Sequence, residues 1–243
     1  MLKPIKRIMW AVSPGLMASL KERREKARIR RAEHRNVSEI FGEIYRDGLW
    51  GGPEGQFYSG EGSDDAVTAD YIAIVRKYID DHDIRSIVDL GCGDFRVGRQ
   101  LQRPGLSYVG VDLVPQMIES HQRQFGSDTV RFMVGNIIED DLPDGQLYLV
   151  RQVLQHLSNE QVGQALDKLR DKPHVLIAEH HPAPSRFKEY NRDKPPGQGI
   201  RVPFGSGVYP DQPPFAFPCT VMESTSVPPL ITVGETIAIY AKT

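Results

Sequence analysis

Cysteines and long apolar runs are scarce in this chain of 243 residues. The two cysteines, Cys92 and Cys219, lie far apart and form no Cys-x-x-Cys pair, which excludes a disulfide framework and a cysteine zinc site and fits a reducing compartment. No apolar stretch approaches the ~18 residues that a membrane-spanning helix needs. Residues 1–20 begin with cations, but Ser, Pro and Gly at 13–15 interrupt their apolar part and no clear cleavage site follows. We therefore discount a secretory signal and expect a cytoplasmic protein.

The chain also lacks a strong overall charge, because its formal net charge is −2. The charges are nevertheless unevenly distributed. Residues 1–35 hold eleven Lys and Arg against three Glu, a net +8, and the rest holds 19 basic and 29 acidic residues, a net −10. An acidic body repels nucleic-acid phosphates, so we expect no nucleic-acid partner. The basic arm is either a solvated helix on its own domain, or a segment that contacts an acidic partner or the anionic lipid of the inner membrane.

Short apolar runs alternate with helix-like stretches over residues 86–181. Such an alternation predicts an α/β fold with a doubly wound, mostly parallel sheet that helices cover on both faces. Residues 219–227 and 235–243 predict a closing β-hairpin. The predicted strands before it are residues 86–91, 107–113, 130–137, 147–154 and 174–181.

Two segments rich in glycine or proline divide the chain. Residues 50–65 form a glycine-rich loop, after which Ser63 is expected to cap a helix. Residues 182–218 are crowded with Pro and Gly and too long for a plain connection, which is typical of functional loops. We therefore divide the chain into a basic helical arm with a lid loop, residues 1–63, and a main domain, residues 64–243.

The run "VDLGCGD" ends the first predicted strand with a turn that keeps two acids, Asp89 and Asp94. Glycine is needed where a backbone takes positive φ or a ligand lies against it, and ligands of open parallel sheets bind at the carboxyl ends of strands. Asp112 ends the next strand, where its carboxylate can accept hydrogen bonds from both ribose hydroxyls of a nucleoside or cap the following helix. Asn136 ends the third strand, where it either reads an adenine edge or shapes a turn.

The turn disfavours phosphate-bearing cofactors. The dinucleotide pattern G-x-G-x-x-G requires Gly at position 96, which is Arg here, beside the bulky Phe95, and no P-loop is present. A cofactor with a cationic amine and no phosphate suits the acids Asp89 and Asp94. These properties are those of S-adenosylmethionine.

The motifs "VDLGCGD", "VGVDL", "GNI" and "VLQHLSNEQ", in this order over residues 84–180, resemble those of the class I S-adenosylmethionine-dependent methyltransferases. The resemblance implies a Rossmann-like sheet of seven strands with an antiparallel last strand. It departs at Phe95, where the family has a third glycine, and in the lack of an Asp at the start of the fourth strand. It implies cofactor contacts from Asp89, Gly91, Gly93 and Gln152 at the methionine part, from Asp112 with Leu113 at the ribose, and from Asn136 with Ile137 at the adenine.

A narrower resemblance concerns the segments outside this core. "EIYRDGLWGG", "YSGEGS" and "N-R-D…G-I-R…PPF" are similar to a bacterial branch found among capsule and lipopolysaccharide biosynthesis proteins. The loop with Ser59 and Gly60 is expected to reach the cofactor carboxylate through backbone N–H groups and hydroxyls, or to be a flexible linker.

Histidines near the strand ends are candidates for chemistry. His156 follows the fourth strand, where its near-neutral unperturbed pKa suits a general base for a hydroxyl acceptor, or where it packs the next helix. Glu179, His180 and His181 end the fifth strand, and His180 is a second catalytic candidate. Neighbours on a strand point to opposite faces, so the three cannot converge on a metal ion, and no metal is expected.

The long loop supplies candidate acceptor contacts: its polar residues Tyr190, Asn191, Asp193 and Arg201 suit a sugar-like or anionic acceptor, or are simply solvated. The leading hypothesis is an O-methyltransferase that acts on a small molecule or glycan. The alternatives are a small-molecule N-methyltransferase and a cofactor-binding module without catalysis. A nucleic-acid methyltransferase is disfavoured further, because no N/D-P-P-Y motif follows the fourth strand.

Overall fold

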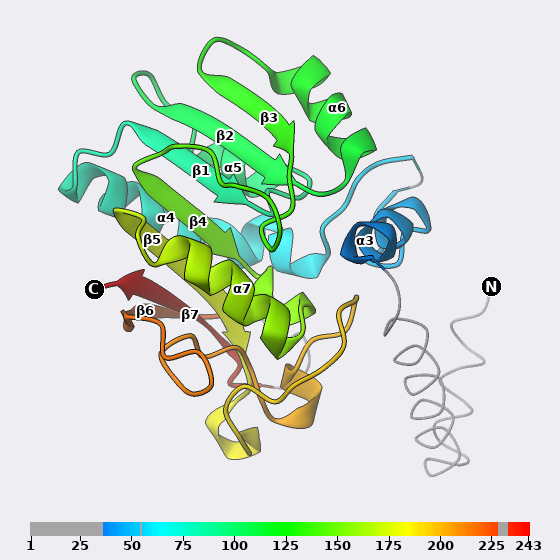
Figure 1. The fold of residues 1–243 in the computed structure, drawn as a ribbon, viewed down its shortest axis with the longest axis vertical. Coiled ribbons are helices and arrows are strands. Elements are labelled where there is room, and N and C mark those ends of the chain that lie inside the picture. The colour runs from blue at the N-terminus through cyan, green and yellow to red at the C-terminus, as the bar shows by residue number, and fades with distance from the viewer. Residues whose placement is uncertain (1–35, 54, 228–232) are drawn as a thin grey trace. The chain divides into compact units, whose positions relative to one another are not determined.

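The computed structural model describes residues 36–53, 55–227 and 233–243, so the basic arm lies outside the described residues. Residues 37–243 form one compact unit around a seven-stranded sheet of order β3-β2-β1-β4-β5-β7-β6 (Figure 1). Strands β1 to β5 are parallel, and β7 runs antiparallel between β5 and β6. The strands are β1 (Ser86–Leu90), β2 (Ser107–Asp112), β3 (Val130–Val134), β4 (Leu147–Arg151), β5 (His174–His181), β6 (Cys219–Ser226) and β7 (Thr236–Lys242). The predicted mostly parallel sheet with an antiparallel end is thus confirmed.

Helices lie on both faces of this sheet, with α7 in front of it and α4 behind in the view of Figure 1. A capping box begins α7, since the Ser158 side chain accepts from the Gln161 backbone and the Gln161 side chain accepts from the Ser158 backbone. The helices are α3 (Val37–Arg46), α4 (Asp65–Asp81), α5 (Arg96–Gln100), α6 (Pro115–Phe125) and α7 (Asn159–Leu169), with 3-10 turns η1 (Glu61–Ser63), η2 (Leu154–His156), η3 (Pro184–Arg186) and η4 (Val202–Phe204). None of the described helices is long and apolar enough to cross a membrane.

The central strands are buried on both faces because helices cover them. One core cluster joins Tyr71 and Val75 of α4 to Ile87, Leu149 and other strand residues. The strand order reverses between β1 and β4, because β2 and β3 follow β1 on one side of it and β4 and β5 lie on the other. The register aligns Leu90 with Val111 and with Val150. The residues that follow these three strands therefore meet at one edge, the switch point at which open sheets bind ligands.

Two predictions about the loops need correction. Ser63 does not cap α4: it lies in η1, its hydroxyl donates to the Gly60 carbonyl at 2.7 Å, and Asp64 is the residue before the helix. The segment 182–218, which the sequence predicts to be a functional loop with polar residues free for an acceptor, is partly packed, because Val208, Phe215 and Phe217 are buried in it. It is held by packing, which limits what it can offer to a ligand.

Candidate active site

The glycine turn after β1 needs its glycines for two reasons. Gly91 and Gly93 have φ of 76° and 53°, which side chains rarely adopt. A Cβ on Gly91 would stand 2.4 Å from a Val153 methyl, and one on Gly93 would stand 2.4 Å from the Ser59 hydroxyl. The turn therefore lies directly against the segment after β4 and the loop before α4.

Two buried carboxylates flank this turn. Asp89 accepts a hydrogen bond from the Tyr108 hydroxyl at 2.6 Å. The two oxygens of Asp112 accept from the backbone N–H groups of Gly93 and Val114, each at 3.2 Å. Burial raises the pKa of both acids to about 6. Asp112 is not the N-cap of α6, which is Val114, and each of its oxygens keeps a lone pair for a hydroxyl donor.

Asn136, at the end of β3, shapes a turn, which is the second of the two roles expected for it. Its Oδ1 accepts from the Ile138 backbone at 3.0 Å, and its own N–H donates to Asp140 at 2.8 Å. Asn136 and Ile137 are buried beside the site edge, and Leu113 is partly buried after Asp112. Their contact with an adenine or a ribose stays a prediction.

Gln152 has the left-handed backbone that a turn at a strand end requires, with φ of 55°. Its N–H donates to the Ala178 carbonyl at 2.8 Å. Its side chain lies over Gly62, where a Cβ would stand 2.3 Å from Oε1. The residue thus joins the end of β4 to the loop that holds Ser59 and Gly60.

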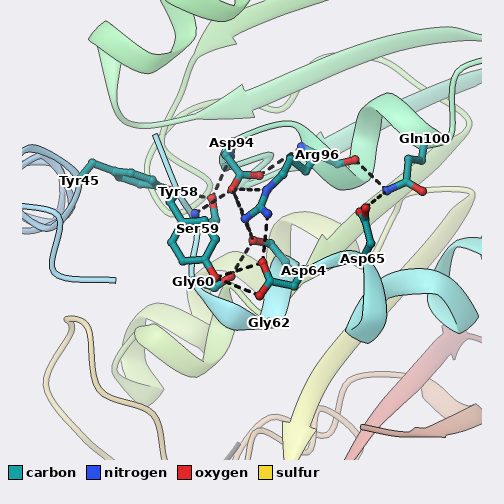
Figure 2. Close-up of polar contacts among 12 residues, drawn as sticks. Tyr45, Tyr58, Ser59, Gly60, Gly62, Asp64, Asp65, Asp94, Arg96 and Gln100 are labelled. Atoms are coloured by element: carbon teal, nitrogen blue, oxygen red, sulfur yellow. Dashed lines mark hydrogen bonds and ion pairs between the residues drawn. The ribbon is translucent and has the colours of Figure 1, made fainter. Parts of the chain in front are cut away.

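That loop is anchored to the glycine turn by the Arg96 cluster, which Figure 2 shows. The cluster comprises Tyr58, Ser59, Ser63, Asp64, Asp94 and Arg96. Ser59 and Asp94 exchange two hydrogen bonds, from Ser59 N–H to Asp94 at 2.9 Å and from Asp94 N–H to the Ser59 hydroxyl at 2.8 Å. The Tyr45 hydroxyl of α3 lies 2.9 Å from the same hydroxyl. The flexible-linker alternative is therefore wrong for Ser59.

Arg96 is the centre of the cluster. Its guanidinium donates to Asp94 at 3.1 Å, to Asp64 at 3.0 Å and to the Ser63 hydroxyl at 2.8 Å, and it lies 4.6 Å from the Tyr58 ring centre. The expectation that Asp94 faces a cationic cofactor amine needs correction, because Arg96 and Ser59 engage its carboxylate. Asp89 therefore remains the candidate acid for contact with the cofactor amine.

His156 lies in η2 within a set of aromatic rings. Its ring centre is 5.3 Å from that of Trp50 and 6.2 Å from that of Phe41. Its Nδ1 faces the Gly197 carbonyl at 3.2 Å, and its Nε2 lies 3.4 Å from the Gln155 amide nitrogen. Burial lowers its pKa to about 3, so the near-neutral value expected from the sequence is wrong. The ring is neutral at pH 7, and a carbonyl partner at Nδ1 assigns the proton there and leaves the lone pair on Nε2.

The other predicted catalytic histidine does not reach this place. His180 is 1% exposed, and its Nε2 lies 2.9 Å from the buried carboxylate of Glu235. His181 is also buried, with Nε2 2.8 Å from the Val208 carbonyl and its ring stacked on Tyr209. Both histidines do end the strand, but they are buried there because the segments of Val208 and Glu235 cover the end of β5. Within the described residues, no group of three His, Cys, Asp or Glu could hold a metal ion.

Three of the four predicted acceptor residues are engaged in hydrogen bonds within the protein. The Asn191 amide donates to the carbonyls of Tyr209 and Pro213, both at 2.9 Å. Asp193 accepts from the Asn159 backbone at 2.8 Å. Arg201 is 1% exposed and donates only to protein oxygens in its five hydrogen bonds. Tyr190 is 53% exposed and free to meet an acceptor.

Sequence reasoning did not identify the aromatic side chains around His156. Phe41 and Tyr45 lie four residues apart on one face of α3, and Trp50 follows that helix with its ring centre 5.0 Å from that of Tyr45. The spacing of the first two on an amphipathic helix was the available signal. The residue that this aromatic face contacts could not be predicted from the sequence, because His156 lies more than a hundred residues further along the chain.

Comparison with known proteins agrees with this geometry. Residues 87–172 match the model of a family described as a methyltransferase domain. The match covers about a third of the chain and supports an S-adenosylmethionine-dependent methyltransferase. No curated protein sequence matches the chain. The capsule and lipopolysaccharide branch is not confirmed and stays a prediction.

Solved structures share the fold of this chain. One is the 1,6-didemethyltoxoflavin N1-methyltransferase of Burkholderia thailandensis, with 18% identity over 85% of this chain and 87% of that chain and a TM-score of 0.56. Another is the magnesium protoporphyrin IX methyltransferase of Synechocystis PCC 6803, with 11% identity over 86% and 100% and a TM-score of 0.54. Both hold S-adenosylhomocysteine. The chain spans 60% of TnmH, a further solved structure. These identities show the fold and leave the acceptor to be argued from the site.

The residues present fit S-adenosylmethionine. Asp112 keeps lone pairs for two hydroxyls while its other hydrogen bonds fix the glycine turn. The cation at position 96, which a phosphate would seek, is already held by Asp94 and Asp64. A cofactor without phosphate therefore suits this edge of the sheet better than a dinucleotide.

Proposed function

We propose that this methyltransferase transfers the methyl group to a hydroxyl oxygen of a small-molecule or glycan acceptor, with His156 as the general base. The position of His156 carries the proposal: it stands on the turn directly after β4, four residues from Gln152, at the edge where the strands that hold Asp89 and Asp112 also end. A base at this edge is close to the cofactor site in the chain and in the sheet. The phosphate-repelling body makes a nucleic-acid acceptor the poorer candidate.

Several residues of the chain would hold the cofactor. Asp112 and Leu113 would bind the ribose, Asn136 and Ile137 would border the adenine, and the remaining residues would line the methionine part: Ser59, Gly60, Asp89, Gly91, Gly93 and Gln152. When bound, S-adenosylmethionine supplies a methyl group on a positively charged sulfur. The protein has mainly to align the acceptor, and such alignment contributes up to roughly 7–11 kcal/mol.

The base needs a ring nitrogen without a proton, and in His156 this is Nε2, which lies 3.4 Å from the Gln155 amide nitrogen. Because the Gly197 carbonyl holds the proton of His156 on Nδ1, Nε2 is the atom that takes the hydroxyl proton as the new C–O bond forms. A positioned base contributes ~10²–10⁴-fold to such a step. Phe41 and Trp50 pack against the ring.

Transfer to nitrogen is the second candidate, and one observation favours it. Burial lowers the pKa of His156 to about 3, which makes the imidazole a weak base in the ground state. A neutral amine attacks with its own lone pair and loses its proton afterwards, so it makes a smaller demand on His156. The two candidates therefore differ in how much the reaction depends on this residue.

The test uses methyl-labelled cofactor and pairs of acceptors that differ only in a hydroxyl or an amine, including sugars and their amino analogues. Mass spectrometry locates the labelled methyl group on oxygen or nitrogen. O-transfer predicts that His156→Gln lowers kcat by roughly 10²-fold with the S-adenosylhomocysteine affinity unchanged. Methylated amines from both proteins at equal rates would replace the first proposal by the second.

We also propose that the basic arm contacts anionic lipid. Its support is the +8 charge of residues 1–35 beside a body of opposite sign. Sedimentation with vesicles of phosphatidylglycerol, against vesicles of phosphatidylcholine, tests it in the full chain. Equal recovery with both vesicles contradicts the contact.

A further inference from the structure

The turn that carries His156 has little stability of its own. Leu154–His156 is a single 3-10 turn, and such short turns depend on their surroundings because their hydrogen-bond geometry is poor. The position of the His156 ring is therefore set by whatever binds the backbone of this turn. Two buried ionisable side chains and one loop do so.

Glu179 of β5 binds the amide side of the turn. Its two carboxylate oxygens accept from the N–H groups of Leu154 at 3.0 Å and Gln155 at 3.2 Å, and the side chain is fully buried. A buried carboxylate is stable only when hydrogen bonds replace its lost water. Glu179 and the turn therefore fix each other.

Arg201 of the long loop binds the carbonyl side of the same turn. Its Nη1 donates to the carbonyls of Leu154 at 3.4 Å and Gln155 at 3.1 Å. Its Nη2 donates to the Leu157 carbonyl at 2.8 Å and to the Asn159 side chain at 2.9 Å. Its Nε donates to the Arg192 carbonyl at 2.7 Å. All five N–H donors of the guanidinium are thus used within the protein.

The loop holds His156 directly as well. The Gly197 N–H donates to the His156 carbonyl at 2.9 Å, and the Lys194 ammonium donates to the same carbonyl at 3.2 Å. The Gly197 carbonyl faces Nδ1 of the ring. One segment of the loop therefore binds both the backbone and the imidazole of His156.

We propose that Glu179 and Arg201 are positioning residues for His156: they hold its turn from the amide and carbonyl sides, and Arg201 fixes the loop whose Gly197 carbonyl sets the imidazole tautomer. The role rests on the proposed function, in which His156 is the base. It assigns to residues 191–201 a task different from acceptor binding. Displacement of the ring by about 1 Å is expected to reduce kcat by up to 10²-fold without loss of substrate binding.

The experiment compares Arg201→Met, Arg201→Lys and Glu179→Gln in the full chain, with S-adenosylmethionine for the kinetics and with S-adenosylhomocysteine bound for the spectra. Arg170→Met is the matched control, because Arg170 also donates to a carbonyl of the long loop, that of Phe215, and does not touch the turn. Glu235→Gln is the control for Glu179, since it is an equally buried carboxylate that binds His180 instead. Histidine-labelled protein gives the NMR signal of the His156 ring and its pKa.

We expect Arg201→Met and Glu179→Gln to lower kcat by about 10- to 100-fold, with the acceptor KM and cofactor affinity unchanged within about threefold. The His156 Nδ1–H signal should weaken and its pKa should rise toward ~6.5, while Arg201→Lys is intermediate and both controls match the wild type. Should Arg201→Met fail to fold, the isosteric Glu179→Gln carries the test.

An unchanged His156 signal in folded variants overturns the positioning role. Loss of the signal in the variants but full activity of His156→Gln supports the positioning role and refutes the base. The two proposals therefore fail in different measurements.

Discussion

At the scale of single residues, Asp112 joins the cofactor site to its scaffold. One carboxylate binds Gly93 of the glycine turn and Val114 before α6. A side chain in such a position affects the ligand directly, through its free lone pairs, and indirectly, through the shape of the turn.

We therefore predict that Asp112→Ala weakens S-adenosylhomocysteine binding by about 1–3 kcal/mol, the scale for lost hydrogen bonds to a charged group. Isothermal calorimetry measures the change. Asp128→Ala, which removes an exposed carboxylate near the start of β3, is the control and should leave the affinity unchanged. Equal affinity of a folded Asp112→Ala protein would restrict this residue to a scaffold role.

The lowered pKa of His156 leads to a pH prediction. The unfolded chain binds a proton at this residue below ~6.5, whereas the folded protein does so only below about 3. Between these values the unfolded state holds more protons, so the free energy of unfolding rises with pH, by at most ~1.4 kcal/mol per pH unit from this residue. His156→Gln should flatten that rise between pH 4.5 and 6.5 in urea titrations. Other titrating groups are common to both proteins and cancel, so parallel curves would show that His156 is not buried.

At the scale of elements, the loop before α4 is part of the cofactor site because the Arg96 cluster holds it on the glycine turn. Arg96→Met removes the cation that lies between Asp94 and Asp64. We predict a cofactor dissociation rate about tenfold higher and faster hydrogen exchange in residues 58–64. Arg103→Met is the control, since it breaks an exposed pair with Asp80 on the other end of α4. Unchanged exchange in Arg96→Met would show that the loop holds without its cation.

Most of the fold could be predicted from the sequence, because strands buried on both faces are continuous apolar runs and the stretches between them have helical character. The glycine turn could be read for the same local reason, since its neighbours in the chain determine its conformation. The burial and the hydrogen-bond partners of the polar residues could not be predicted from the sequence. Arg201 is of a type that is mostly exposed, and nothing local indicates that carbonyls 44 to 47 residues away satisfy its donors.

His180 illustrates the same limit, because its position in the strand was predicted and its burial was not. Its place at a strand end was predicted, and the strand does end there. The partner that buries it, Glu235, comes from the segment just before β7, 55 residues later. A sequence pattern fixes which end of a strand a side chain occupies, whereas its exposure depends on segments that pack there later in the chain.

At the scale of the whole molecule, the cofactor should stabilise the fold because its predicted contacts come from the ends of β1, β2, β3 and β4 and from the loop before α4. Those segments must be in place together for binding, and the unfolded chain offers none of them. Binding to the folded state alone adds about 2.7 kcal/mol at a ligand concentration 100 times Kd. For a domain of this size that corresponds to a rise in Tm of roughly 5–10 °C.

NAD should not give this rise. A pyrophosphate at the start of α5 would lie close to Arg96, but also close to Asp94 and Asp64. The negative charges of these two carboxylates already neutralise the Arg96 guanidinium. Thermal unfolding with S-adenosylhomocysteine, with NAD and with both ligands measures the difference, and NAD should leave the shift from S-adenosylhomocysteine unchanged. The shift should be smaller in Asp112→Ala and unchanged in Asp128→Ala at the same ligand concentration. A comparable shift with NAD alone would mean that the carboxylates around Arg96 do not determine which cofactor this edge of the sheet accepts.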